Sequence, residues 1–347
     1  MKTVLLYIII SLALIEAGYI YLLKTNSIPD ESLQAILPIE KPLEEYSFAN
    51  LRKTSFPSTD IILGEEVSET ASSTARLFYF STPTTPQSTG TKKVSGLINI
   101  PKGPGTYPVI VMFRGYVPAE IYKPGMGTQP SASVFSQQRF ITLAPDFLGY
   151  GESDKPSTNS FEDRFETYTT ALSLLASITN LNSALEKEFA GQVKAESNHI
   201  NLWGHSNGGH IALATLAITG QNYPTVLWAP VSKSFPYSIL YYTDEYDDQG
   251  KATRKALSDF EKLYDTQVFS PPRYYRFITA PIALFQGRND QEVLPWWSAE
   301  LAKKLREDYE LDIEYTEYPN ADHNLQPDGW NDAVSRSMSF YRTHILP

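Results

Sequence analysis

The pentapeptide Gly204-His205-Ser206-Asn207-Gly208 combines a potential nucleophile with a glycine at each end. An apolar run at residues 200–203 precedes it, and a helix-like run at residues 210–217 follows it. A strand, a glycine-bounded serine and a helix in that order favour a tight turn that points the serine hydroxyl away from the sheet. The amide of Asn207 would then lie at a helix N-terminus, where unpaired N–H groups stabilise negative charge. The pattern predicts nucleophilic attack by Ser206, and a chance glycine-rich turn is the alternative.

A serine hydroxyl needs a base to take its proton, and that base is usually a histidine. The chain has five histidines. Four are excluded by position, since two belong to the pentapeptide and its helix, one precedes the strand and one lies near the C-terminus (His205, His210, His199 and His344). His323 remains, in a turn-rich loop after the strand-like run at residues 313–318. It is the candidate base, and a surface loop histidine is the alternative interpretation.

The acid that orients the base is expected between the serine and the histidine in chain order. Asp290 follows the short apolar run at residues 281–285, which predicts a buried parallel strand. Catalytic groups collect beyond the carboxyl ends of such strands. Asp322 is the rival, but neighbouring side chains in a loop seldom face each other. The order Ser206, Asp290, His323 therefore predicts a catalytic triad.

A second donor for a developing oxyanion is expected after an earlier strand. The buried-strand pattern at residues 109–113 is followed by Arg114-Gly115-Tyr116. The backbone N–H of Tyr116 is therefore the candidate partner of the Asn207 amide in an oxyanion hole.

Four motifs together resemble the α/β-hydrolase superfamily, and more narrowly its prolyl oligopeptidase-type and dienelactone-hydrolase-like branch. They are G-H-S-N-G-G, D-F-L-G-Y-G-E-S-D after a strand, G-R-N-D-Q-E-V and the D-H-N loop near the C-terminus. The resemblance covers roughly residues 66–347. It implies a mostly parallel central sheet flanked by helices, with a helical cap insertion. It also implies that Ser206 is the nucleophile, Asp290 the acid and His323 the base.

The sequence departs from the family at Arg114, because the family usually has His-Gly at this strand end. The amide after the glycine is kept, so the oxyanion hole is expected to survive. Arg114 is a candidate for binding a substrate carboxylate, and a structural ion-pair partner is the alternative. Oligopeptidases of the family carry a large β-propeller before the catalytic domain. The chain has no room for one, which weakens a peptidase assignment.

About fifty residues separate the strands predicted at residues 225–229 and 281–285, too many for an ordinary connection. The resemblance implies a cap over the site at about residues 231–278. Tyrosines are frequent there, and amphipathic aromatic side chains suit a pocket wall. Tyr241 and Trp296 are the candidate substrate contacts, and packing of the cap and of the following helix is the alternative.

Residues 4–23 are largely apolar, although Glu16 interrupts them. Twenty helical residues span about 30 Å, enough to cross a bilayer, while an acidic residue near the middle costs about 2–3 kcal/mol. We expect residues 1–24 to be an uncleaved membrane anchor or a signal peptide, with the anchor favoured because no clean cleavage site follows. Lys2 and the amino group would stay inside, so the catalytic domain is expected outside the membrane, either anchored or secreted.

The proline-containing acidic segment at residues 25–65 predicts an extended linker or strap, and residues 66–347 predict one catalytic domain. A net charge of −10 and a pI near 5.1 argue against nucleic-acid binding. Five scattered histidines and no cysteine argue against a zinc site, and no cofactor is implied. The sequence does not indicate an oligomeric state.

The expected activity is hydrolysis of a carboxylic ester or a short peptide or amide bond through an acyl-enzyme. A serine-type exopeptidase is the alternative within this class. The alternative from another class is an inactive hydrolase fold used as a binding module.

Overall fold

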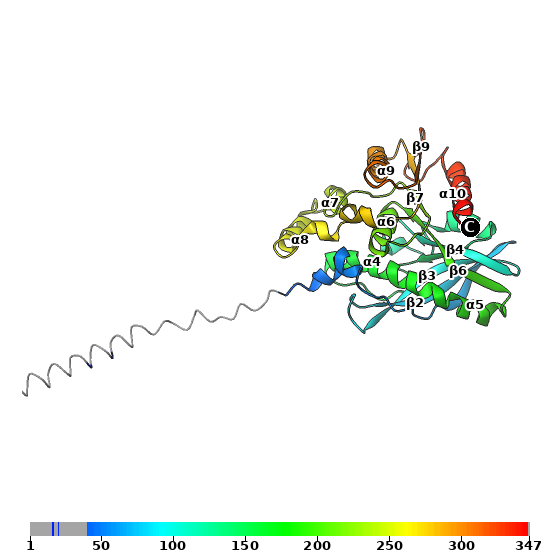
Figure 1. The fold of residues 1–347 in the computed structure, drawn as a ribbon, viewed down its shortest axis with the longest axis horizontal. Helices are drawn as coiled ribbons and strands as arrows, with labels where there is room; N and C mark the ends of the chain where they lie inside the picture. Colours follow the sequence, from blue (N-terminus) through cyan, green and yellow to red (C-terminus); the bar gives the residue numbers. More distant parts are fainter. Residues whose placement is uncertain (1–15, 17–19, 21–39, 346–347) are drawn as a thin grey trace, which may run out of the picture. The chain divides into compact units, whose positions relative to one another are not determined.

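The computed structural model describes residues 16, 20 and 40–345, and residues 42–347 form one compact unit. Within the described residues, one nine-stranded sheet has the order β1-β2-β3-β5-β4-β6-β7-β8-β9 (Figure 1). The strands are β1 (Ile62–Glu69), β2 (Ser73–Pro83), β3 (Thr91–Pro101), β4 (Gly105–Phe113), β5 (Ile141–Pro145), β6 (Val193–His205), β7 (Thr225–Trp228), β8 (Ile282–Gly287) and β9 (Ile313–Tyr318).

Neighbouring strands from β5 to β9 pair in parallel, whereas β1, β2 and β3 form an antiparallel edge that joins β5. The predicted mostly parallel sheet is therefore confirmed. Because all these parallel strands run the same way, the loops after β4, β6, β8 and β9 emerge at one edge of the sheet.

Helices cover both faces of the sheet, as the continuous apolar runs of its central strands require. In the compact unit, the described helices are α2 (Phe48–Leu51), α3 (Gln129–Gln137), α4 (Ser160–Ser177), α5 (Leu181–Phe189), α6 (Asn207–Thr219), α7 (Tyr237–Leu240), α8 (Lys251–Glu261), α9 (Pro295–Tyr309) and α10 (Trp330–Ile345). Along β4, Val109 and Val111 join the core with α4 and α6, whereas Ile110 and Met112 join the core with α3 and α10. This alternation has the two-residue period of a strand.

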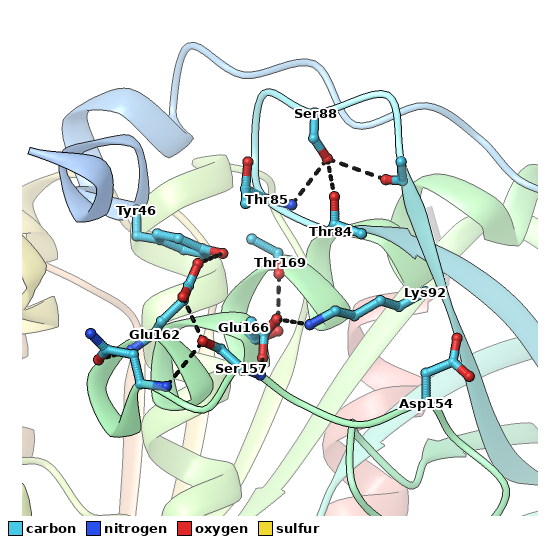
Figure 2. Close-up of polar contacts among 12 residues, drawn as sticks. Tyr46, Thr84, Thr85, Ser88, Lys92, Asp154, Ser157, Glu162, Glu166 and Thr169 are labelled. Carbon is cyan, nitrogen blue, oxygen red and sulfur yellow. Dashed lines mark hydrogen bonds and ion pairs between the residues drawn. The ribbon is translucent and has the colours of Figure 1, made fainter.

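The strap was expected over residues 25–65, but its last part belongs to the compact unit. The short helices η2 (Pro42–Tyr46) and α2 bury Leu43, Tyr46, Phe48 and Leu51. The Tyr46 hydroxyl donates to Glu162 on α4 at 3.2 Å, beside the ion pair between Lys92 and Glu166 (Figure 2). These apolar contacts explain why the unit begins at Pro42 rather than at residue 66.

The insertion between β7 and β8 is helical, containing α7, α8 and three 3₁₀ turns, η5 (Thr243–Glu245), η6 (Thr266–Phe269) and η7 (Pro271–Phe277). Phe260 and Phe269 pack against Phe165 of α4. Tyr264, Tyr274 and Tyr275 are buried, so these tyrosines pack the insertion onto the domain.

The predicted membrane anchor or signal peptide at residues 1–24 lies almost entirely outside the described residues. Of the helices in the described part, none combines the length and the apolar character needed to cross a membrane.

Candidate active site

Ser206 occupies a sharp turn between β6 and α6. Its φ of 56° and ψ of −121° lie in a region that non-glycine residues rarely adopt, which stores local strain. The surrounding glycines permit this turn. A Cβ at Gly208 would lie 1.9 Å from the carbonyl oxygen of Phe113, and one at Gly204 would lie 2.6 Å from the carbonyl oxygen of Gly208. The predicted strand–turn–helix context is therefore present.

Asp290 and His323 meet, although 33 residues separate them. The Nδ1 of His323 lies 2.9 Å from Oδ2 of Asp290. The amides of Glu292 and Val293 donate to the other oxygen, both at 2.9 Å, and the Gln286 side chain donates to Oδ2 at 2.9 Å. Because a carboxylate only accepts, Nδ1 of His323 carries the proton, and its Nε2 is left to accept another.

The Ser206 hydroxyl makes no hydrogen bond to His323 in this structure, so the structure joins two of the three predicted triad residues directly. In enzymes without bound substrate, this contact is often long and tightens in the complex. The rival acid, Asp322, accepts from the amides of Asn324 and Gln326 and caps its own loop.

His205 is a site residue that sequence analysis set aside. Its Nε2 lies 3.0 Å from the backbone carbonyl oxygen of His323, and the two rings are 4.6 Å apart. Burial, and then the neighbouring His323, lower the pKa of His205 to about 4. A neutral His205 with its proton on Nε2 therefore donates to the loop that carries His323. In the sequence, the position of His205 at the end of a predicted strand and next to Ser206 could have indicated that it lies in the site.

The two predicted oxyanion donors are the backbone amides of Tyr116 and Asn207. Within the described residues, neither the Tyr116 amide nor the Asn207 amide has a hydrogen-bond acceptor from the protein. Gly115 lies directly against Ser206, since a Cβ added to it would be 3.0 Å from Ser206 Cβ and 3.5 Å from Oγ. The Tyr116 side chain is exposed.

The Arg114 side chain is buried and faces the protein. It donates to the carbonyl oxygens of Gly115 at 2.9 Å and Asp146 at 3.0 Å. Its guanidinium also lies 4.0 Å from the Tyr150 ring centre and 4.7 Å from that of Tyr122. With 6% of Arg114 exposed, the side chain has a structural setting, but its partners are backbone carbonyl oxygens and aromatic rings rather than the carboxylate of an ion pair.

Tyr241 and Trp296 have different surroundings. Tyr241 packs edge-to-face against Trp297, with the ring centres 4.8 Å apart, and burial, followed by neighbouring groups that include Asp290, raises the pKa of Tyr241. Trp296 is 48% exposed and lies under the Lys233 ammonium at 4.0 Å. Packing accounts for the surroundings of Tyr241.

A cavity of about 420 Å³ adjoins the His323 loop on the α3 and α10 side. Its lining includes His205, Asn324, Trp203, Trp228 and Trp330, but neither Tyr241 nor Trp296. Among the residues that the structure describes, no three histidine, aspartate or glutamate side chains gather closely enough to hold a metal ion.

Two family models match the sequence. Residues 183–346 match the prolyl oligopeptidase family, and residues 81–227 match the chlorophyllase family. Both ranges contain the Ser206 turn, while the first adds Asp290 and His323.

Individual relatives are more distant. Lipase 1 of Psychrobacter immobilis is 27% identical over 154 residues, which make up 43% of this chain and 42% of the lipase. The chain thus spans about two fifths of the length of this curated relative. The acetyl xylan esterase from Paenibacillus sp. R4 has a TM-score of 0.55 at 15% identity, covering 91% of this chain and 99% of that one. Acetyl xylan esterase 1 from Thermoanaerobacterium sp. JW/SL YS485 has a TM-score of 0.53 at 16% identity, covering 87% of this chain and 93% of that one. At such identities these two structures show a shared fold.

Fold, strand-end loops and sequence matches agree on the class of protein. The chain has the α/β-hydrolase fold, and its two family matches and its sequence similarity to a lipase indicate a serine hydrolase. Its C-terminal half is similar to the prolyl oligopeptidase family, which confirms the predicted resemblance.

Proposed function

We propose that the protein hydrolyses carboxylic esters through Ser206, with His323 as the base and Asp290 as the residue that orients it. The observation that carries this proposal is the hydrogen bond between His323 and Asp290, on loops at the same sheet edge as the Ser206 turn. It fixes the tautomer in which Nε2 of His323 can take the Ser206 proton.

The reaction proceeds in two halves. Ser206 Oγ attacks the carbonyl carbon while His323 removes its proton, and the amides of Tyr116 and Asn207 stabilise the oxyanion. Protonated His323 then gives its proton to the leaving alcohol, which leaves an acyl-Ser206. Water activated by the same histidine releases the acid and restores the serine. The sequence similarity to a lipase supports an ester substrate.

Hydrolysis of a short peptide or amide is the second candidate. It is favoured by the match of residues 183–346 to the prolyl oligopeptidase family. An amide needs the same attack, but its leaving amine must be protonated by His323. A small-molecule ester or a short peptide is thus the proposed partner at the site.

The test is Ser206→Ala, with the exposed α10 residue change Ser335→Ala as the matched control. Wild type and the control are expected to react with a fluorophosphonate and to hydrolyse p-nitrophenyl esters, whereas Ser206→Ala does neither. Retained labelling of Ser206→Ala would rule out the assignment. A panel of acyl esters beside aminoacyl-p-nitroanilides then ranks the two substrate classes by kcat/KM.

We also propose that the catalytic unit works outside the cytoplasmic membrane, because of the apolar run at residues 4–23. Cell fractionation tests the location, and N-terminal sequencing of the mature protein distinguishes an anchor from a removed signal peptide. Recovery of the full-length chain in the cytosol would contradict this proposal.

A further inference from the structure

Arg114 holds the loop that supplies the proposed oxyanion amide. Its side chain is buried, and its Nη1 donates to the Gly115 carbonyl oxygen at 2.9 Å. The second terminal nitrogen donates to the carbonyl oxygen of Asp146, just beyond β5, at 3.0 Å. One planar guanidinium therefore ties the loop after β4 to the end of the neighbouring strand.

The guanidinium is itself held in place. It lies against the rings of Tyr150 and Tyr122, with distances of 4.0 Å and 4.7 Å to the ring centres. The Tyr122 hydroxyl donates to the buried Asp146 carboxylate at 2.6 Å. The Tyr150 hydroxyl donates to the Val117 carbonyl oxygen at 3.0 Å, on the same loop as Gly115. A side chain locked by packing and by neighbouring hydrogen bonds is the kind that can set the geometry of a site.

The bonded carbonyl determines where the neighbouring amide points. The Gly115 carbonyl and the Tyr116 N–H belong to one peptide unit, and this unit is trans. In a planar trans unit these two groups point in opposite directions. With the oxygen held by Arg114, the Tyr116 N–H points away from the guanidinium, and Gly115 itself lies against Ser206.

We propose that Arg114 is a positioning residue, which orients the Gly115–Tyr116 peptide so that the Tyr116 amide faces the oxyanion formed at Ser206. This inference rests on the proposed function, since it needs Ser206 as the nucleophile. Two carbonyl oxygens and two aromatic faces suit the planar fork of arginine, and the single ammonium of lysine cannot reproduce this set. Arg114 thus acts through the backbone and does not touch the substrate.

The experiment compares Arg114→Lys and Arg114→Gln with wild type in the full chain. The matched control is Arg139→Lys, because Arg139 also lies over a tyrosine ring, that of Tyr107 at 4.9 Å. Tyr107 lies near the start of β4, whereas Arg114 follows its end, so the control leaves the site alone. Tyr150→Phe is a milder second variant that removes only the bond to Val117.

Loss of an oxyanion donor lowers kcat by about 10²–10³-fold, and a misdirected donor is expected to lower it by about 10–100-fold in both Arg114 variants. The KM stays within about threefold, and the affinity for a trifluoromethyl ketone that adds to Ser206 falls by the same factor as kcat/KM. The pH dependence of kcat/KM keeps its shape, because the variants leave the acid–base groups of the site in place. Tyr150→Phe gives a smaller loss of the same kind, and Arg139→Lys behaves as wild type.

Two results would overturn the role of Arg114 while leaving the proposed function intact. One is folded Arg114 variants with wild-type kcat and ketone affinity. The other is a raised KM at unchanged kcat, which means direct substrate contact. If Arg114 variants do not fold, an unchanged kcat and ketone affinity in folded Tyr150→Phe would overturn it as well. A wild-type protein inert to fluorophosphonate refutes the proposed function itself, and this proposal with it.

Discussion

Replacement of Asp290 by asparagine tests the proposed triad at its most constrained residue. One carboxylate oxygen accepts the amides of Glu292 and Val293, whose backbone positions are set by the loop. In Asp290→Asn, the amide oxygen must therefore take that side, and the NH₂ group must face His323. An imidazole can bond to a donor only by accepting, so Nδ1 of His323 would lose its proton and Nε2 would carry it.

That tautomer cannot take the Ser206 proton. In serine hydrolases with this triad, the wrong tautomer costs about 10⁴-fold in kcat, equivalent to about 5 kcal/mol of transition-state free energy. Folding is affected less. The Gln286 side chain loses its acceptor at Asp290 but keeps the carbonyl oxygens of Gly287 and Val293, at 3.1 and 3.3 Å. A loss of about 1–3 kcal/mol in the free energy of unfolding is expected.

The assay is the steady-state hydrolysis of a p-nitrophenyl ester, with urea unfolding to verify the fold. The matched control is Asp322→Asn, because an asparagine oxygen can accept the same two loop amides as the Asp322 carboxylate. The control is expected to stay within a few-fold of wild type. A folded Asp290→Asn with more than a tenth of the wild-type kcat would refute the tautomer argument.

Three further predictions concern the surroundings of the site. Gly115→Ala is expected to lower kcat by about 10²-fold because the added methyl group crowds Ser206. Hydrolysis of a p-nitrophenyl ester measures kcat, and the melting temperature is expected to stay unchanged. An unchanged kcat would contradict the prediction. Burial lowers the pKa of His205 to about 4 and that of His210 to about 3, so the unfolded chain binds protons that the folded chain does not, and stability falls as pH drops from about 6.5 to 4. Urea unfolding at pH 7, 5 and 4 measures this fall, which is expected to be smaller in His210→Leu than in wild type. An equal dependence of the unfolding free energy on pH in the two proteins would contradict this prediction. Arg52→Ala removes hydrogen bonds of 2.6 and 2.9 Å to the carbonyl oxygens of Ala217 and Ile218, near the C-terminus of α6. The free energy of unfolding measured by urea titration is expected to fall by about 1–3 kcal/mol. An unaltered urea midpoint would show that these two hydrogen bonds do not stabilise the fold.

Apolar runs were sufficient to predict three parallel strands of the sheet. The runs at residues 109–113, 225–229 and 281–285 became β4, β7 and β8, because a strand buried on both faces is apolar throughout. By contrast, β1 is an edge strand whose residues are mostly exposed, and it lacks such a run. The polar first half of β6 is a strand because it pairs with the start of β4, and this pairing leaves no local pattern.

Local motifs identified Asp290 and His323, which the structure brings together, because each follows a strand at the same sheet edge. The support beneath the site was not predictable in this way. His205 bonds to a carbonyl oxygen 118 residues away, and Arg114 bonds to carbonyl oxygens of two different loops. Such contacts between a side chain and a distant backbone group depend on the conformations of the loops in the folded structure. No periodicity or spacing in the sequence predicts them.

The helices η2 and α2 at the start of the compact unit have a consequence for proteolytic maturation. A protease that cuts between the apolar run and Pro42 removes no residue of this unit. A cut near residue 66 would instead strip Phe48 from the rings of Tyr168 and Tyr274 and remove Arg52 from the end of α6. Since α6 carries Ser206 at its other end, the damage would fall on the helix that holds the nucleophile. A released form that keeps these contacts must therefore begin before Phe48.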